Sequence, residues 1–354
     1  MYEKAGEKYF IVDSHMHYWD ASPANWVPGH EQYAKGWIEC FHAYQSLGPP
    51  ETHWTIEHFQ KCSEQDLMKD VFEDGHVDVA IFQPTYLKEW YTQGFNTTEH
   101  NGALSDKHPG KFVVNTRWDP RDGDPGLKEL EQNVERWGSK GVKLYTAEWN
   151  NGSRGWTLKD PGAYRYLEKC QELGIKNIHV HKGPTIWPLD KDAFDVSDVD
   201  HAATDFPELN FIVEHVGLPR IEDFCFMATQ EPNVYAGLSV VIGGLMYSRP
   251  KFFAKVMGEL LFWVGEDKMT FGSDYSIWEP KWQVEGFVDW DYPSSEEFSD
   301  YPRVTSGTKK KILGLNAARL YGIEVPKEAQ LPANAGTPAG KDDAVLVEGA
   351  GAPG

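Results

Sequence analysis

Two histidines near the N-terminus are spaced for shared chemistry. His15 and His17 stand two residues apart in the segment DSHMH, at the end of the first expected strand. Side chains two apart on a β-strand point to the same face, so the two imidazoles would project together. Imidazole binds zinc, iron, manganese, cobalt and nickel alike. The pair therefore indicates part of a metal site, although this spacing is a weak motif by itself.

Three further polar residues stand at the ends of apolar runs later in the chain. His181 ends NIHVH, His215 ends NFIVEH, and Asp274 follows MTFGS. If these runs are parallel strands, the three side chains lie where a strand stops and a loop begins. We therefore predict that four imidazoles and one carboxylate share a cation, with the ligands His15, His17, His181, His215 and Asp274.

The elements that would position these residues follow one pattern. A short run of β-branched or aromatic residues is followed by an amphipathic helix, again and again, which is typical of a parallel sheet with crossover helices. The 354 residues exceed the roughly 250 of a (β/α)8 barrel, a fold that carries its catalytic groups at the strand ends. We predict an α/β protein with a (β/α)8, TIM-like barrel. Its strands would be Tyr9–Ser14, Val77–Gln83, Lys111–Thr116, Gly141–Thr146, Asn177–His181, Asn210–His215, Val234–Leu238 and Met269–Ser273.

Helix signals lie between these strands. Ser63 can cap a helix over residues 64–74. Pro125 and Pro161 each follow an aspartate and stand where the first helical turn tolerates a missing N–H. A further helix, rich in Phe, Leu and Met, is expected over residues 250–264. These signals predict crossover helices that pack on the outside of the barrel.

Two regions interrupt the pattern. Residues 18–62 contain four tryptophans and several tyrosines and phenylalanines, which predicts an insertion at the mouth of the barrel, either a lid or a subunit contact. Residues 326–354 are rich in Ala, Gly and Pro and lack aromatic side chains, so they would bury too little apolar surface to offset chain entropy. We expect the barrel to span residues 1–325 and the remainder to form an extended or disordered arm.

The composition excludes several classes of partner. The formal net charge of −20 disfavours nucleic acid, whose binding requires clustered Lys and Arg. No stretch approaches the roughly 18 apolar residues of a membrane-spanning helix, and residues 1–10 show no secretory signal, so a cytoplasmic location is expected. The four widely spaced cysteines fit neither a disulfide framework nor a zinc finger. We expect a small-molecule substrate and, given the aromatic insertion and the arm, a homo- or hetero-oligomer of related subunits.

Several segments resemble one enzyme superfamily over about residues 9–323. These segments are IVDSHMH, GVKLY, the HKG after strand five, EHVG, FGSD and the closing KKKILGLNAARLYG. They resemble the amidohydrolase superfamily, and more narrowly its amidohydrolase-related branch, which includes the aminocarboxymuconate-semialdehyde and resorcylate decarboxylases. The resemblance implies the metal-dependent hydrolase fold, with His15, His17, His181 and Asp274 binding metal. It implies that His215 is either a ligand of a second metal or the base that handles a proton.

The resemblance also bears on the number of metal ions. In dinuclear members of the superfamily, a carbamylated lysine at the end of strand four bridges two ions, and Lys143 in GVKLY has the matching position. Lysine also occurs there in mononuclear relatives, so one or two divalent ions remain open. The ligand types permit zinc, manganese or iron.

Four further residues are candidates for the site. His179, two before His181, should also face inward, either as a polar residue deeper in the barrel or as an extra ligand. Glu148, just past strand four, is either a carboxylate ligand or a loop residue. Arg154 in the following loop and Lys182 after His181 are candidate anchors for a substrate carboxylate, with a solvated loop charge as the other reading of Arg154.

The predicted metal site favours hydrolysis or decarboxylation of a small carboxylate- or amide-bearing compound. A bound divalent ion lowers the pKa of water from about 15.7 to about 7. Asp274 would be both ligand and proton acceptor, and His215 would polarise a carbonyl or pass a proton. One alternative is a dinuclear iron or manganese–iron monooxygenase of a small amino-acid-like substrate, because the RGW, HKG and SIW segments resemble the subgroup with 2-aminoisobutyrate hydroxylase. A second alternative is a non-catalytic partner subunit of such an enzyme.

Overall fold

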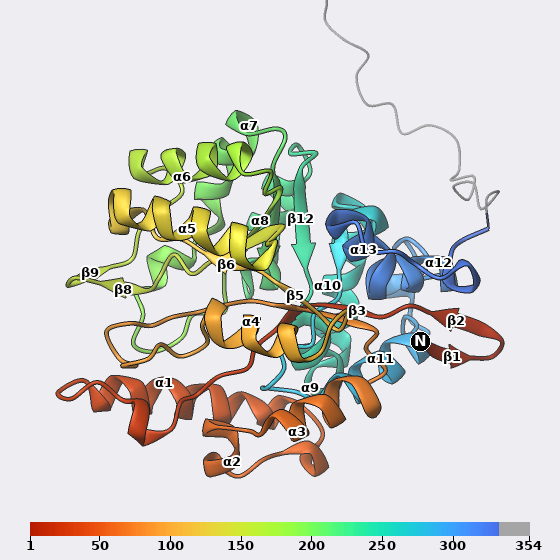
Figure 1. Ribbon diagram of the computed structural model, residues 1–354. Helices are drawn as coiled ribbons and strands as arrows, with labels where there is room; N and C mark the ends of the chain where they lie inside the picture. Colours follow the sequence, from red (N-terminus) through yellow and green to blue (C-terminus); the bar gives the residue numbers. More distant parts are fainter. Residues whose placement is uncertain (333–354) are drawn as a thin grey trace, which may run out of the picture.

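Parallel strands form the centre of the fold in two sheets (Figure 1). The structure is a computed structural model, and it describes residues 1–332. The first sheet pairs three strands in chain order: β3 (Val12–Met16), β4 (Val79–Phe82) and β5 (Phe112–Val114). The second sheet pairs six, also in chain order: β6 (Thr116–Arg117), β7 (Gly141–Leu144), β10 (Asn177–His181), β11 (Asn210–Glu214), β12 (Val234–Gly237) and β13 (Met269–Thr270).

The two sheets join into one closed barrel. Only Asn115 separates β5 from β6, so these two segments are one strand of the barrel with an interrupted ladder. On the other side, the backbone N–H of Ser14 donates to the carbonyl of Phe271 at 2.9 Å, and that of Asp274 donates to the carbonyl of His15 at 2.9 Å. Within the described residues this gives eight barrel strands, counting β5 and β6 together, and confirms the predicted (β/α)8 fold.

The ends of the first and last strands differ from the predicted bounds. The first barrel strand begins at Val12 because the preceding residues form a separate hairpin of β1 (Tyr2–Lys4) and β2 (Glu7–Tyr9). The last strand pairs regularly only over Met269–Thr270. Beyond it Gly272 lies against β3, where a Cβ atom would be 2.5 Å from the Cβ of His15. This close approach brings the segment before Asp274 directly beside His15.

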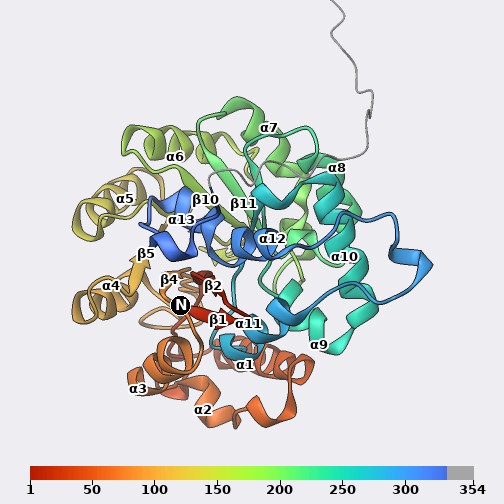
Figure 2. The same ribbon diagram turned by 90° about the vertical axis from the view of Figure 1, so that its right-hand side faces the viewer.

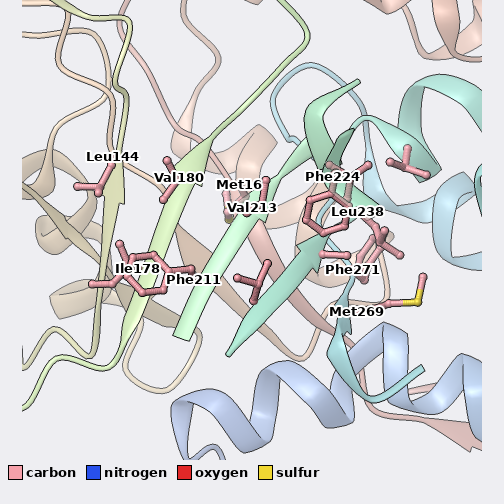
Figure 3. Close-up of a cluster of buried hydrophobic side chains, with 14 of the residues drawn as sticks. Met16, Leu144, Ile178, Val180, Phe211, Val213, Phe224, Leu238, Met269 and Phe271 are labelled. Carbon is pink, nitrogen blue, oxygen red and sulfur yellow. The ribbon is translucent and has the colours of Figure 1, made fainter. Parts of the chain in front are cut away.

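Helices surround the barrel, as Figure 2 shows in the view onto the end that carries the β1–β2 hairpin. Alternate side chains of the strands pack beneath them, including Ile178 and Val180 of β10 in the buried cluster of Figure 3. Because neighbouring residues on a strand face opposite sides, His179 and His181 point into the barrel. The covering helices are α4 (Thr98–Lys107), α5 (Gly123–Trp137), α6 (Pro161–Glu172), α7 (Val199–Asp205), α8 (Ile221–Ala228), α10 (Pro250–Trp263) and α11 (Pro280–Asp289).

The helix ends follow the sequence signals. Ser63 accepts a hydrogen bond from the backbone N–H of Asp66 and caps α3 (Glu64–Leu67), which continues as a π-helical stretch to Glu73. The closing segment contains α12 (Ser306–Lys310), a π-helical stretch and α13 (Asn316–Tyr321). It brings the hydroxyl of Tyr321 inside the barrel, 2.7 Å from Nε2 of His179.

The insertion at residues 18–62 folds onto the barrel mouth and contains α1 (Glu31–Tyr44) and α2 (Ile56–Gln60). A short helix, α9 (Met246–Ser248), lies on the neighbouring rim of the barrel. A hairpin of β8 (Trp149–Asn150) and β9 (Ser153–Arg154) projects beside it. Aromatic side chains of the insertion join those of other loops in a second buried cluster, which includes Trp19, Trp37, Phe41, Phe59, Trp90 and Trp278. Of the predicted arm, residues 333–354 lie outside the described residues, and Lys327–Ala329 form a short 3-10 helix. No helix within residues 1–332 is long and apolar enough to cross a bilayer.

Candidate metal centre

Three of the predicted ligands meet at one end of the barrel. Nε2 of His15 lies 3.1 Å from Nε2 of His17. Oδ1 of Asp274 lies 3.6 Å from Nε2 of His15 and 3.3 Å from Nε2 of His17. All three side chains are buried. The strand end and the loop after β13 therefore deliver two imidazoles and a carboxylate to one point.

The contacts of the opposite ring nitrogens fix where the imidazole protons lie. Nδ1 of His17 lies 2.7 Å from the carbonyl oxygen of Gln83. Nδ1 of His15 lies 2.9 Å from a carboxylate oxygen of Glu214. A carbonyl or carboxylate oxygen only accepts, so both Nδ1 atoms carry the proton and both Nε2 atoms carry a lone pair. Burial lowers the pKa of His15 to about 3, which keeps this ring neutral.

The donor set fits a cation. The lone pairs of the two Nε2 atoms face each other and an oxygen of Asp274, an arrangement that is repulsive unless a positive charge lies between them. One ring nitrogen of His15, one ring nitrogen of His215 and one carboxylate oxygen of Asp274 also lie within 4.8 Å of one another. Neutral imidazole and carboxylate are the forms that bind zinc, manganese and iron.

A second pair of histidines adjoins the first group. Nε2 of His215 lies 3.2 Å from Nδ1 of His181. Nδ1 of His215 lies 3.0 Å from the carbonyl oxygen of Ser239 and donates to it, so its Nε2 also carries a lone pair. Burial lowers the pKa of both rings. The rings of His15 and His215 lie 5.1 Å apart between centroids, so all four imidazoles form one continuous cluster.

The backbone is strained at two members of this cluster. Asp274 has a φ of 59° and His215 a φ of 65°, in the left-handed region that side chains other than glycine rarely adopt. Each such residue costs of order 1–3 kcal/mol and tends to occur where function requires it. At Asp274 and His215 the unusual backbone turns a side chain toward the cluster.

Lys143 lies beside the same histidines. It pairs in register with His179 of the neighbouring strand, and its Nζ lies 3.4 Å from Nε2 of His15. The side chain is 1% exposed, and burial lowers the pKa of its amine to about 8. The structure thus places this lysine within reach of the cluster, in an environment that makes its amine easier to deprotonate than an exposed lysine.

Glu214 is a functional candidate that sequence reasoning missed. One oxygen contacts His15, as described, and the other lies 2.5 Å from Nδ1 of His179. Burial opposes its ionisation, but these two imidazole contacts outweigh burial and hold the pKa of the carboxyl well below its ordinary value. Gly237 of β12 leaves room for it, since a Cβ there would overlap the carboxylate. The available signal was a carboxylate inside the apolar run NFIVEH.

Two of the weaker candidates lie away from the cluster. The nitrogens of His179 are occupied by Glu214 and by the hydroxyl of Tyr321, so His179 is a polar residue deeper in the barrel. Glu148 is buried beside Arg117, which opposes the rise that burial causes in the pKa of its carboxyl. Its oxygen accepts only a 3.4 Å bond from the backbone N–H of Lys88.

The predicted carboxylate anchors do not reach the pocket. Arg154 is exposed on β9, and its guanidinium carbon lies 4.3 Å from the ring centroid of Trp149 on the paired strand. Lys182 is buried, but its Nζ lies 2.7 Å from Asp198 and 3.1 Å from the carbonyl oxygen of Ala193. Lys182 therefore holds the loop after β10 against α7 and its neighbours.

A pocket opens above the cluster. Its floor contains His17, His181, His215 and Asp274. Within residues 1–332 no lysine or arginine lines it. The insertion and the loops after the strands supply an aromatic wall of Trp37, Phe41, Tyr44, Phe95, Tyr145 and Trp278. The site therefore combines a metal-binding floor with walls suited to a small, flat and largely apolar molecule.

Comparison with known proteins agrees with this architecture. A family model described as Amidohydrolase matches residues 12–323. No curated protein sequence matches closely enough to count as a relative.

Solved structures share the fold at low sequence identity. An uncharacterised TIM-barrel protein from Bordetella bronchiseptica has a TM-score of 0.63 and 17% identity, covering 90% of this chain and 99% of its own. A 5-carboxyvanillate decarboxylase from Novosphingobium aromaticivorans, with bound manganese, has a TM-score of 0.57 and 14% identity over 89% and 97% of the two chains. An amidohydrolase from Burkholderia multivorans, with bound zinc, has a TM-score of 0.58 and 14% identity over 89% and 100%.

Proposed function

Because this chain belongs to the amidohydrolase family, we propose that it is a metal-dependent enzyme that hydrolyses or decarboxylates a small carboxylate- or amide-bearing compound. The proposed ligands of the first ion are His15, His17, His181 and Asp274. The observation that carries the proposal is the approach of Nε2 of His15 and Nε2 of His17 to Oδ1 of Asp274, with a ring nitrogen of His215 within 4.8 Å of ligand atoms of His15 and Asp274.

We assign separate roles in the reaction to Asp274, His215 and the aromatic wall. A divalent cation at this site supplies a Lewis acid that acidifies water and polarises a carbonyl or carboxylate. The carboxylate of Asp274 would accept a proton from water, and Nε2 of His215 would hold or deliver a proton at the reacting atom. The aromatic wall would orient the rest of the substrate and exclude bulk water.

The number of ions depends on Lys143. With its amine 3.4 Å from His15, a carbamylated Lys143 would add a carboxylate to the cluster, which would allow a second ion with His215 as one of its ligands. Unmodified, Lys143 would remain a neighbouring amine, and the site would hold one ion. The manganese and zinc of the two structural neighbours make these metals the first to test.

The decisive experiment combines metal analysis with turnover. The purified protein should contain one or two equivalents of zinc, manganese or iron, and a chelator should abolish turnover of a panel of carboxylates, lactones and amides. Metal at 100 times its Kd should also add about 2.7 kcal/mol to the free energy of unfolding. A protein that binds no metal, or one whose activity survives complete metal removal, would contradict the proposal.

The same preparation distinguishes the alternatives. Two redox-active ions and dioxygen uptake that depends on substrate would support a dinuclear iron or manganese–iron monooxygenase instead. A metal-loaded protein without any turnover, which raises the activity of a related subunit, would support a non-catalytic partner.

A further inference from the structure

Tyr145 lies against the cluster at the end of β7. Its ring centroid lies 4.3 Å from that of His181, with 33° between the ring planes. Its hydroxyl lies 3.4 Å from Nε2 of His181. The side chain is buried, and Trp37 and Phe194 contact it at ring distances of 5.8 and 6.2 Å. These contacts fix the position of the hydroxyl.

The proton of this hydroxyl is free for another partner. Nδ1 of His181 faces Nε2 of His215 inside the cluster, and as a metal ligand it carries a lone pair. Nε2 of His181 then carries the ring proton and donates it to the oxygen of Tyr145. That oxygen acts as the acceptor, so the O–H of Tyr145 points elsewhere, and Tyr145 lines the pocket.

The other residues of the pocket offer few donors to a ligand. Apart from the cluster, its lining side chains with a hydroxyl are Tyr44, Thr85 and Tyr145, and those with an indole N–H are Trp37 and Trp278, of which Trp278 donates to the carbonyl of Tyr44. Of these three hydroxyls, that of Tyr145 is the one in contact with a cluster histidine.

We propose that Tyr145 is a substrate-binding residue whose hydroxyl donates a hydrogen bond to an oxygen of the substrate beside His181. This inference rests on the proposed function, because it takes His181 as a metal ligand. In place of the arginine or lysine that binds carboxylates in many sites, the neutral hydroxyl of Tyr145 would hold this substrate oxygen. The ligand class is a small compound with an acceptor oxygen next to its metal-bound group, such as a carboxylate, a phenolate or a carbonyl.

The test compares Tyr145→Phe with the wild-type protein, both fully loaded with metal. Phenylalanine keeps the ring contacts with His181 and Trp37 and removes only the hydroxyl. Tyr166→Phe is the matched control, because its buried hydroxyl donates to the carbonyl of Gly123 at 2.6 Å, away from the pocket. Binding of acetate, benzoate and 2-hydroxybenzoate is measured by calorimetry, and bound metal is counted in each sample.

Tyr145→Phe should keep its metal and bind the best probe roughly 10- to 100-fold more weakly, the range of a hydrogen bond to a charged group. Tyr166→Phe should bind it as the wild type does. Equal affinity of Tyr145→Phe and wild type overturns the inference and leaves the proposed function intact. A Tyr145→Phe protein that cannot be loaded with metal also overturns it, because the hydroxyl then acts only through His181. A metal-loaded wild type that binds none of the probes overturns the proposed substrate class and this inference with it.

Discussion

Oε2 of Glu214 lies 2.9 Å from Nδ1 of His15. This contact holds the proton of His15 on Nδ1 and leaves the lone pair of Nε2 for the cluster. A carboxylate behind a ligating imidazole also makes the imidazole more basic and fixes its orientation. The strand that leads into His215 therefore also supplies Glu214, the carboxylate that orients His15 for metal binding.

Replacement of Glu214 by Gln should weaken metal binding. The amide has nearly the same shape but no charge, so it holds the proton of His15 on Nδ1 less strongly. We expect the Kd for zinc or manganese to rise roughly 10- to 100-fold. Competition with a chelator of known affinity measures this change. Glu208→Gln, at an exposed position, removes the same charge and should leave the Kd unchanged. Equal Kd values for both variants would show that the Glu214 carboxylate does not strengthen metal binding by His15.

Gly237→Ala should disturb the same carboxylate from its other side. An added Cβ would overlap Glu214, so the carboxylate must move away from His15 or the strand must shift. Overpacking of a buried site costs about 1–3 kcal/mol, and we expect that loss in urea unfolding together with weaker metal binding. Gly307→Ala is the control, because its nearest neighbour would be the hydroxyl of Thr305 at an ordinary 3.4 Å. A Gly237→Ala protein with wild-type stability would mean that the carboxylate has room to spare.

Asp274→Asn separates charge from shape. Asparagine tolerates the left-handed backbone better than other residues, so the φ of 59° should persist and the protein should fold. The amide cannot accept a proton from water, and it is a poorer ligand than a carboxylate. Turnover should fall at least about 100-fold, the smallest usual effect of a lost general base. Circular dichroism checks the fold, and the exposed Asp300→Asn serves as a matched charge change. Turnover within a factor of two of wild type would remove Asp274 from the chemistry.

The sequence was sufficient to locate the convergence of the five predicted ligands. Strand alternation places His15 with His17 and directs His181 inward, and these consequences of local geometry need no knowledge of distant contacts. The closed barrel then brings the strand ends together. For the same reason His179 could be expected to face inward, but only the structure shows that Glu214 and Tyr321 occupy its nitrogens.

Other features depend on contacts that sequence patterns do not specify. Adjacent residues of a strand normally face opposite sides, which would separate Glu214 from His215. Alternation with Phe211 and Val213 of the outer core directs Glu214 inward, and the left-handed backbone at His215 turns that side chain inward as well, which nothing in the local sequence announces. Arg154 was placed near the pocket by its position after strand four, but the β8–β9 hairpin and Trp149 direct it outward. Loop paths follow such long-range packing.

The last prediction concerns Glu279, outside the proposed site, at the start of α11. Burial, and then the charge of Asp70, raise the pKa of its carboxyl from an ordinary 4.5 to about 7. Between these two values the folded protein binds more protons than the unfolded chain, so stability falls as the pH rises from 4.5 to 7. Above pH 7 the carboxylate is ionised in both the folded and the unfolded states, so it lowers the free energy of unfolding by an amount that no longer changes with pH.

Glu279→Gln removes this cost, because glutamine stays neutral at every pH. The variant should therefore be more stable than the wild type at pH 8, and the difference should disappear near pH 4, where the wild-type carboxyl is protonated in both states. Unfolding midpoints in urea between pH 4 and pH 8 measure the difference. Glu208→Gln, whose side chain is exposed, should show no such pH-dependent gain. If Glu279→Gln changed stability equally at both pH values, the amide would act through packing, and the carboxyl would titrate normally in the folded protein.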